Sequence, residues 1–383
     1  MTTASYVASR RNLSWFEKIL HLNWVLVLLI AVIAGIGCAM QYSMAGGHFY
    51  PWAAPQMERF AIGLLILMAV SLIDIRIWMT LAYPAYVVSF LLLIAVEMVG
   101  HVGLGAQRWI ELGPIQIQPS ELMKISLVLA LARYLHGLGV EDISKPYRLF
   151  TALVMIAAPA ILVLKEPNLG TATILLADGV SLLFLAGLSW WWILPSFAGL
   201  IAAVPVAWHF LHDYQKRRVL TFLNPQSDAL GAGWNIGQAE IAIGSGGMGG
   251  KGFVQGTQSR LNFLPEKNTD FAFSALGEEF GFIGSVALLV LFAVVMFLGM
   301  RIAMASRSQF GRLVAIGVTL NFFFYIMINA AMVMGLIPVV GIPMPLISYG
   351  GTAMLTVMFG FGLLMSVHVH RQTEIPRKPG AIL

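Results

Sequence analysis

Long apolar runs, separated by short polar connections, repeat along most of this chain. A transmembrane helix needs about 20 consecutive apolar residues, and several runs reach or approach that length. One connection, at 212–270, is much longer than the others. The pattern predicts an all-α polytopic membrane protein with about ten transmembrane helices and a large loop between helices 7 and 8. The predicted spans are 22–42, 57–73, 77–100, 119–137, 148–165, 169–187, 190–211, 271–300, 312–336 and 345–369.

Composition agrees with this pattern. Of the 383 residues, 58% are hydrophobic and only 11% are charged, whereas a soluble domain carries about 25% charged residues. The single cysteine, Cys38, lies in the first apolar run, which excludes a disulfide framework and a thiolate metal site. The net charge of +5 is better explained by membrane topology and anionic lipid than by nucleic acid.

The distribution of Lys and Arg predicts the orientation of the chain. Cytoplasmic loops of membrane proteins are enriched in these residues. With ten spans and a cytoplasmic N-terminus, most basic residues outside the long loop fall on the cytoplasmic side. We therefore expect a cytoplasmic segment at 1–21, a transmembrane domain at 22–369 and a cytoplasmic tail at 370–383. The loop 212–270 then faces the exterior, where its basic residues suggest an anionic ligand.

Charged residues at the start of the fourth predicted span form the first candidate site. Glu121 and Lys124 are three residues apart and share a helix face, and Arg108 precedes them in a polar loop. Charges inside a span face the protein interior or a wet cavity. Two interpretations remain open: an internal ion pair that stabilises helix packing, or a polar cavity wall where Lys124 and Arg108 meet a phosphate.

The long loop offers basic and glycine-rich segments. Lys216, Arg217 and Arg218 form a basic triplet that is either a solvated patch or a binding surface. The glycine-rich segment 244–252 is either a flexible linker or a set of backbone amides that cradle phosphate. Residues 234–243 are apolar at helical spacing, which favours a helix at the membrane interface.

Asp270 lies where the long loop meets the eighth predicted span, with Arg260 and Lys267 nearby in sequence. If the helix begins there, Asp270 shares a face with Ser274 and Gly277. The carboxylate is either a salt-bridged cap or a general base that accepts a sugar proton. Cations beside it would stabilise the charge on a departing pyrophosphate. A divalent cation such as Mg²⁺ or Mn²⁺ is chemically plausible there, although no cluster of ligands demands it.

Two further segments are polar or irregular at the same predicted exterior side. The turn at 164–171 contains Asn168, which either caps the sixth span or contacts substrate. The segment 340–352 contains two prolines and a glycine pair, which argues for an irregular start to the tenth span. That segment is either a helix kink or the lining of a polar cavity, with Ser348 as a candidate substrate contact.

A series of motifs, in order along the chain, resembles the SEDS family of shape, elongation, division and sporulation proteins, and is most similar to its elongation branch. The resemblance covers residues from about 20 to 370. The motifs are GAQRW at 105–109, QPSE at 118–121, PNLGT at 167–171, GAGWN at 231–235, FLPEKNTDF at 263–271 and GIPMPLISYGG at 341–351.

This resemblance implies a bacterial peptidoglycan glycosyltransferase of the inner membrane, which polymerises lipid II into β-1,4 glycan strands. It places the family's essential acid on Asp270, its acid–base pair on Glu121 and Lys124, and its loop arginine on Arg108. Many relatives carry aspartate where this chain has Asn168, which favours capping over a charged role for that turn. The resemblance also implies a class B penicillin-binding protein as partner.

Two other functions stay open at this point. A lipid II flippase would use the same charged cavity without chemistry, and a membrane scaffold of the cell-wall elongation machinery would use its intramembrane polar residues for packing.

Overall fold

The computed structural model describes residues 14–99, 101–103, 106–112, 115–166, 168–189, 191–192, 213–224, 232–261, 263–264 and 266–376. Seven helices in this part of the chain are long and apolar enough to cross a membrane. They are α3 (Trp24–Met44), α4 (Ala53–Leu72), α5 (Ile75–Val99), α8 (Pro146–Lys165), α14 (Ala272–Ala305), α15 (Gln309–Val333) and α16 (Gly351–Val369).

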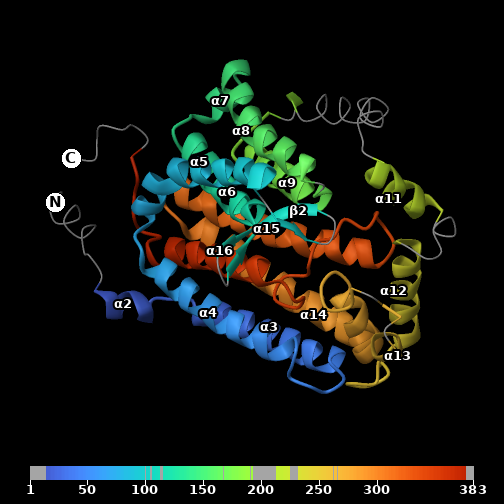
Figure 1. The fold of residues 1–383 in the computed structure, drawn as a ribbon. Coiled ribbons are helices and arrows are strands. Elements are labelled where there is room, and N and C mark those ends of the chain that lie inside the picture. The colour runs from blue at the N-terminus through green and yellow to red at the C-terminus, as the bar shows by residue number, and fades with distance from the viewer. Residues whose placement is uncertain are drawn as a thin grey trace.

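Two further helices match predicted spans. These are α6 (Pro119–His136) and α9 (Leu169–Leu185), of which α9 is shorter than the others and α6 is buried along most of its length. The polytopic all-α fold is therefore confirmed (Figure 1). The seventh predicted span, 190–211, falls almost wholly outside the described residues. The remaining helices in the described residues are α2 (Trp15–Leu20), α7 (Val140–Ile143), α11 (Asp213–Leu223), α12 (Ala232–Gly246) and α13 (Thr257–Arg260).

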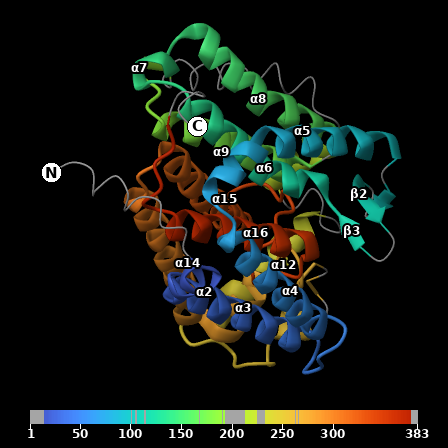
Figure 2. The same ribbon diagram turned by 90° about the vertical axis from the view of Figure 1, so that its left-hand side faces the viewer.

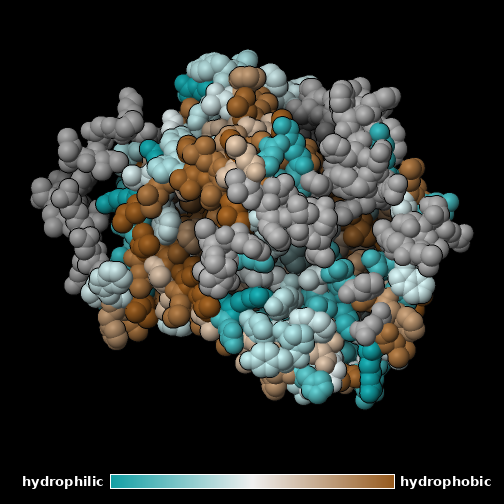
Figure 3. All heavy atoms as spheres, viewed as in Figure 1, coloured by the Kyte–Doolittle hydropathy of each residue, from teal (hydrophilic) through white to brown (hydrophobic). Residues whose placement is uncertain are grey.

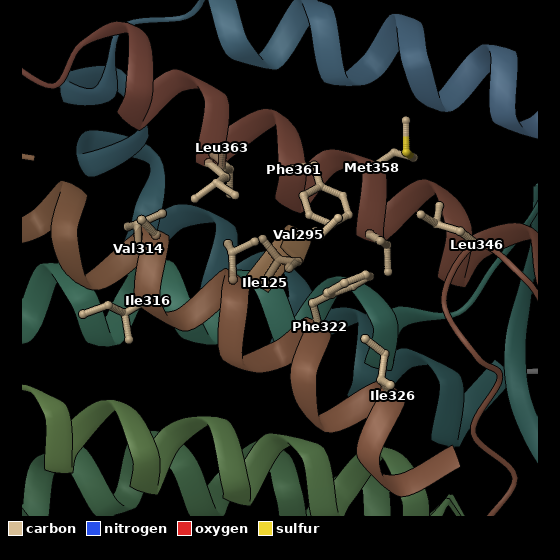
Figure 4. Close-up of a cluster of buried hydrophobic side chains, with 14 of the residues drawn as sticks. Ile125, Val295, Val314, Ile316, Phe322, Ile326, Leu346, Met358, Phe361 and Leu363 are labelled. Atoms are coloured by element: carbon tan, nitrogen blue, oxygen red, sulfur yellow. The ribbon is translucent and has the colours of Figure 1, made fainter. Parts of the chain in front are cut away.

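Helix α15 is the centre of the bundle. About 78% of its apolar stretch is buried inside the protein, compared with 22% of the apolar stretch of α5. Helix α15 therefore packs on protein, whereas α5 faces outward. The Phe322 ring of α15 makes T-shaped contacts with the rings of Phe292 and Phe361, with centroids 5.6 and 5.0 Å apart. Figure 4 shows Phe322 and Phe361 among the buried side chains between the helices. Edge-to-face contacts of this kind add to the stabilisation from burial.

The outer helices present apolar side chains to their surroundings. Leu28 of α3, Leu65 of α4, Leu91 of α5 and Phe282 of α14 are all exposed. Figure 3 shows hydrophobic residues gathered across the left and centre of one face. A soluble monomer rarely exposes such large apolar areas, and this surface suits contact with lipid.

A small antiparallel sheet replaces the loop expected between the third and fourth spans. It contains β1 (His101–Gly103), β2 (Ala106–Leu112) and β3 (Ile115–Ile117), in the order β1-β2-β3. It lies beside the ends of α5 and α6 (Figure 2). Strands β1 and β3 are too short to give an alternating pattern, and apolar and polar residues do not alternate strictly in β2, so hydropathy did not predict the sheet.

The long helix α14 is interrupted at Gly281, which has a φ of 66°. The glycine-rich segment 247–252 packs into this break. The amide of Phe282 donates to the Gly247 carbonyl at 2.8 Å, and the amide of Gly252 donates to the Glu279 carbonyl at 3.0 Å. Backbone amides of the glycine-rich segment thus bond to α14, which favours a structural role over a phosphate cradle.

Replacing Gly250 with alanine is expected to destabilise this junction by about 1–3 kcal/mol. Gly250 has a φ of 79°, and a Cβ there would lie 2.1 Å from the Glu279 carbonyl oxygen. Gly249→Ala is the matched control, because a Cβ at Gly249 meets nothing within 4 Å. Thermal unfolding in detergent measures the difference. Equal melting temperatures for the two variants would contradict the packing described for this segment.

Candidate functional site

Asp270 lies in a turn that ends just before α14. The amides of Thr269 and Phe271 both donate to the Glu266 carbonyl, at 3.3 and 3.2 Å. The helix begins at Ala272, so the condition under which Asp270 would share a helix face with Ser274 is not met. The reason is local, because the turn closed on Glu266 occupies the backbone before the helix can start. Asp270 is half-buried, so it can be reached from outside without being fully solvated.

The segment between α15 and α16 packs against this turn. Gly341 has a φ of 70°, and a Cβ built there would lie 3.4 Å from Oδ2 of Asp270. The backbone of the segment therefore approaches the carboxylate at a position that favours glycine. The irregular start predicted for the tenth span is confirmed, and α16 begins at Gly351 rather than at 345.

Ser348 stabilises this segment from within. Its hydroxyl accepts a hydrogen bond from the Met344 amide at 2.9 Å, and the residue is buried. It also borders a cavity of about 10 Å³, which Tyr325 and Met344 line as well. That volume is close to the minimum for one water molecule. The contact with Met344 favours a structural role for the Ser348 hydroxyl.

The two cations nearest to Asp270 in sequence differ in their surroundings. Lys267 is only 6% exposed, its ammonium donates to the Ser259 carbonyl, and it lies 5.8 Å from the ring centroid of Trp52. Burial lowers the pKa of the Lys267 ammonium below its ordinary value. Arg260, at the end of α13, is exposed. Of the two, Arg260 is the cation that a ligand can reach without rearrangement of the loop.

Glu121 and Lys124 form an ion pair inside the helix bundle. The Lys124 ammonium lies 2.7 Å from Oε1 of Glu121 and also contacts the Tyr325 hydroxyl, which donates to Oε2 of Glu121. The side chain of Lys124 is 1% exposed and that of Glu121 is 5% exposed. On the same face of α15, Asn321 donates to Oδ2 of Asp178 at 2.5 Å. This closed arrangement favours the packing interpretation of the pair over a phosphate-binding wall.

Arg108 lies on β2 and reaches the turn between α8 and α9. Its Nε donates to the Glu166 carbonyl at 3.0 Å. Asn168 accepts from the Thr171 amide at 3.2 Å and caps α9, as its capping interpretation predicted. A Cβ at Gly170 would lie 2.5 Å from Ile342. The start of α9 therefore packs on the same segment that approaches Asp270.

The carboxylate of Glu166 is buried beside Arg108, and sequence reasoning did not select it as a site residue. Neither of its oxygens has a hydrogen-bond partner among the described residues. Burial raises the pKa of this carboxyl to about 8, the Arg108 guanidinium opposes the rise and Glu97 adds to it.

The raised pKa of Glu166 predicts a pH-dependent stability. The unfolded chain loses this proton near the ordinary pKa of 4.5, whereas the folded chain keeps it up to about 8. The stabilisation is therefore complete below pH 4.5 and is lost as pH rises through about 8. We expect the melting temperature of wild type to fall relative to that of Glu166→Gln between about pH 5 and pH 8.5. If the melting temperatures of the two proteins change with pH by the same amount, this expectation is contradicted.

The basic triplet lies on α11. Lys216 is half-buried, while the side chains of Arg217 and Arg218 lie outside the described part of the chain. Helix α12 covers 234–243, which confirms that this apolar stretch is helical, and α11 packs against it. Within the described residues, His, Cys, Asp and Glu side chains form no group of three that could hold a metal ion.

The chain is similar to known proteins over most of its length. A model of the FtsW, RodA and SpoVE family, described as cell cycle protein, matches residues 15–373. The peptidoglycan glycosyltransferase MrdB of Escherichia coli K12 is 41% identical over 362 residues, which cover 94% of this chain and 96% of that protein. Stage V sporulation protein E of Bacillus subtilis is 32% identical and covers 90% of this chain and 96% of its own length.

Two solved structures are similar along most of the chain. One is a structure described as showing the structural coordination of polymerization and crosslinking by a peptidoglycan synthase complex. It has a TM-score of 0.80, is 32% identical, and the match covers 91% of this chain and 98% of that one. The other is the rod shape determining protein RodA of Thermus thermophilus, with a TM-score of 0.70, 29% identity, and coverage of 91% and 97%.

Proposed function

Because the chain belongs to the FtsW, RodA and SpoVE family, we infer that it is a peptidoglycan glycosyltransferase of a bacterial membrane. Its similarity to MrdB extends over nearly the whole of both proteins. The observation that carries the chemical proposal is the half-buried carboxylate of Asp270, at the junction of a long polar loop and a membrane helix. This position suits a substrate that has a polar head and a lipid tail.

The substrate in this proposal is lipid II, and Asp270 is the general base. The carboxylate accepts the proton of the 4-hydroxyl of the acceptor GlcNAc. That oxygen bonds to the anomeric carbon of the donor MurNAc and inverts it. The bond from this carbon to the phosphate oxygen breaks, and its electron pair leaves with undecaprenyl pyrophosphate. The product is a β-1,4 glycan strand, as cell elongation requires.

Positive charge near the departing pyrophosphate comes from the exposed Arg260 and from Arg108 in this proposal. Cations placed where negative charge develops stabilise the transition state. Lys267 and Lys216 are secondary candidates, and Lys124 is assigned to packing because Glu121 and Tyr325 already occupy its ammonium. If a divalent cation is used, the pyrophosphate itself supplies oxygen ligands for it.

The proposed partner is a class B penicillin-binding protein, which would supply crosslinking. The similarity to a structure from a peptidoglycan synthase complex supports this assignment. Both termini are proposed to be cytoplasmic on the basis of the Lys and Arg distribution. The ends of α4 and α16 meet on that side, where the Ser366 hydroxyl donates to the Ile73 carbonyl at 2.7 Å. The Asp270 turn then faces the periplasm.

The test is glycan synthesis from purified lipid II by the purified protein in complex with its penicillin-binding protein. The proposal predicts polymer on a gel. Movement of fluorescent lipid II across vesicles without polymer would instead indicate a flippase. Neither polymer nor movement, from a complex that is folded and assembled, would indicate a scaffold.

A further inference from the structure

Three buried side-chain amides donate to the segment before α16, and two of them also donate to the Asp270 turn. They are Gln41 of α3, Gln56 of α4 and Asn329 of α15, and each is 0% exposed. We call these three residues the amide clamp. Each one donates hydrogen bonds to backbone carbonyls of irregular chain, whereas most buried carbonyls in a helical protein bond within helices.

Asn329 joins the two irregular segments at the position of Asp270. Its Nδ2 donates to the Asp270 carbonyl at 2.9 Å and to the Ile342 carbonyl at 2.6 Å. Both of its N–H groups are therefore used, and its Oδ1 is buried without a hydrogen-bond partner in the described part of the chain. Since two carbonyl oxygens face the amide, only its nitrogen end can lie there.

Gln41 joins the two segments at a second point, and Gln56 holds the segment before α16 alone. The Nε2 of Gln41 donates to the carbonyls of Asn268 and Ile347, at 3.0 and 3.1 Å. The Nε2 of Gln56 donates to the Ser348 carbonyl at 3.1 Å. As in Asn329, the side-chain oxygens of both glutamines are buried and have no partner among the described residues. All three amides thus serve as donors, which a carboxylate or an apolar side chain cannot replace.

The clamp matters because the turn at 266–271 lies outside any helix or strand. A catalytic group must be held within about 0.5 Å of its productive position, and a displacement of about 1 Å can cost about 100-fold in rate. The hydrogen bond from Asn329 to the Asp270 carbonyl holds the backbone of the base itself. The second hydrogen bond from Asn329 holds the carbonyl of Ile342. Ile342 follows Gly341, and it is the backbone of Gly341 that approaches the Asp270 carboxylate.

We propose that Asn329 is a positioning residue for Asp270, and that the amide clamp sets where the Asp270 carboxylate lies. This inference rests on the proposed function, in which Asp270 is the base. It assigns a role to an uncharged residue of a central membrane helix that does not itself reach the substrate.

The test compares Asn329→Ala with Asn321→Ala in steady-state polymerisation of lipid II by the complex with the penicillin-binding protein. Asn321 is a matched control, because it lies two turns away on the same face of α15 and holds a buried group, Asp178. We expect Asn329→Ala to lower kcat by about 10–100-fold with KM changed by less than about 3-fold. We expect Asn321→Ala to stay within about 3-fold of wild type per folded molecule. Equal losses in the two variants would overturn the proposal.

Two more variants separate hydrogen bonding from packing. Asn329→Leu keeps a side chain of similar size without donors and should be as slow as Asn329→Ala. Asn329→Gln keeps the donors and should recover part of the rate. If Asn329→Leu turns over like wild type, the donors are unnecessary and the proposal fails. These variants also answer the question if Asn329→Ala does not fold.

A double substitution distinguishes failure of this inference from failure of the proposed function. A residue that acts through Asp270 has nothing to position once the carboxylate is gone. Asn329→Ala should therefore leave the residual rate of Asp270→Asn unchanged, and a further 10-fold loss would overturn the positioning role. If Asp270→Asn by itself polymerises like wild type, the proposed function fails. A slow Asp270→Asn variant beside a normal Asn329→Ala variant refutes only the clamp.

Discussion

Replacing Asp270 with asparagine is expected to lower the rate of glycan polymerisation by about 10²–10⁴-fold, the range that a positioned general base contributes. Asparagine has nearly the same shape as aspartate but cannot accept the proton of the acceptor hydroxyl. The hydrogen bond from Asn329 should survive, because it goes to the backbone carbonyl of Asp270 and not to its side chain. The measurement is the polymerisation rate from purified lipid II at equal amounts of folded protein.

Glu266→Gln is the matched control for this substitution. Glu266 is an acid in the same turn, and its Oε2 accepts from the Thr269 hydroxyl at 2.9 Å. Glutamine retains an oxygen that can accept this bond, so the turn should keep its shape and its activity. If both substitutions slow polymerisation to the same extent, the loss would come from disturbance of the turn, and Asp270 would lose its assignment as the base.

Replacing Lys124 with methionine is expected to destabilise the protein by about 3–5 kcal/mol, the usual effect of leaving one member of a buried ion pair without its partner. The Glu121 carboxylate would remain buried between α6 and α15, where it keeps the hydrogen bond from the Tyr325 hydroxyl but loses the ammonium. Thermal unfolding in detergent, followed by loss of the monodisperse peak, measures the change. This loss of stability should be measurable without an activity assay.

The double substitution Glu121→Gln with Lys124→Met distinguishes packing from phosphate binding. Removal of both charges abolishes the unpaired carboxylate, so much of the stability should return. If the pair serves packing, polymerisation should return with it. A variant that regains stability but does not polymerise would show that Lys124 contributes to catalysis or binding, contrary to the packing interpretation of the pair.

Hydropathy was sufficient for most of the fold because each span is an independent apolar helix. The predicted spans other than 190–211 coincide with helices of the structure, within a few residues at their ends. The errors fall where the backbone is not helical. The tenth span starts at Gly351 because the residues before it, including Pro343 and Pro345, form an irregular segment. Strands β1 and β3 were missed because they are short, and β2 because its apolar and polar residues do not alternate strictly.

The candidate site was only partly predictable. The motif around Asp270 pointed to the acid, and the spacing of Glu121 and Lys124 predicted their pairing. The amide clamp was not found, because Gln41, Gln56 and Asn329 lie far from Asp270 in sequence and each is an isolated polar residue in an apolar run.

One signal for part of the site was present in the sequence. Asn321, Tyr325 and Asn329 recur every four residues in an otherwise apolar helix, and such a face points into the protein. Their partners, however, come from four other parts of the chain, which one-dimensional periodicity cannot bring together.

A structure of the Asp270→Asn variant with lipid II bound would test the role of Asp270 most directly, because it locates the acceptor sugar. We expect the GlcNAc 4-hydroxyl to lie about 2.6–3.2 Å from the side chain at position 270, as general base catalysis requires. An ordered acceptor whose 4-hydroxyl faces another residue, with position 270 out of its reach, would contradict the assignment of Asp270 as the base.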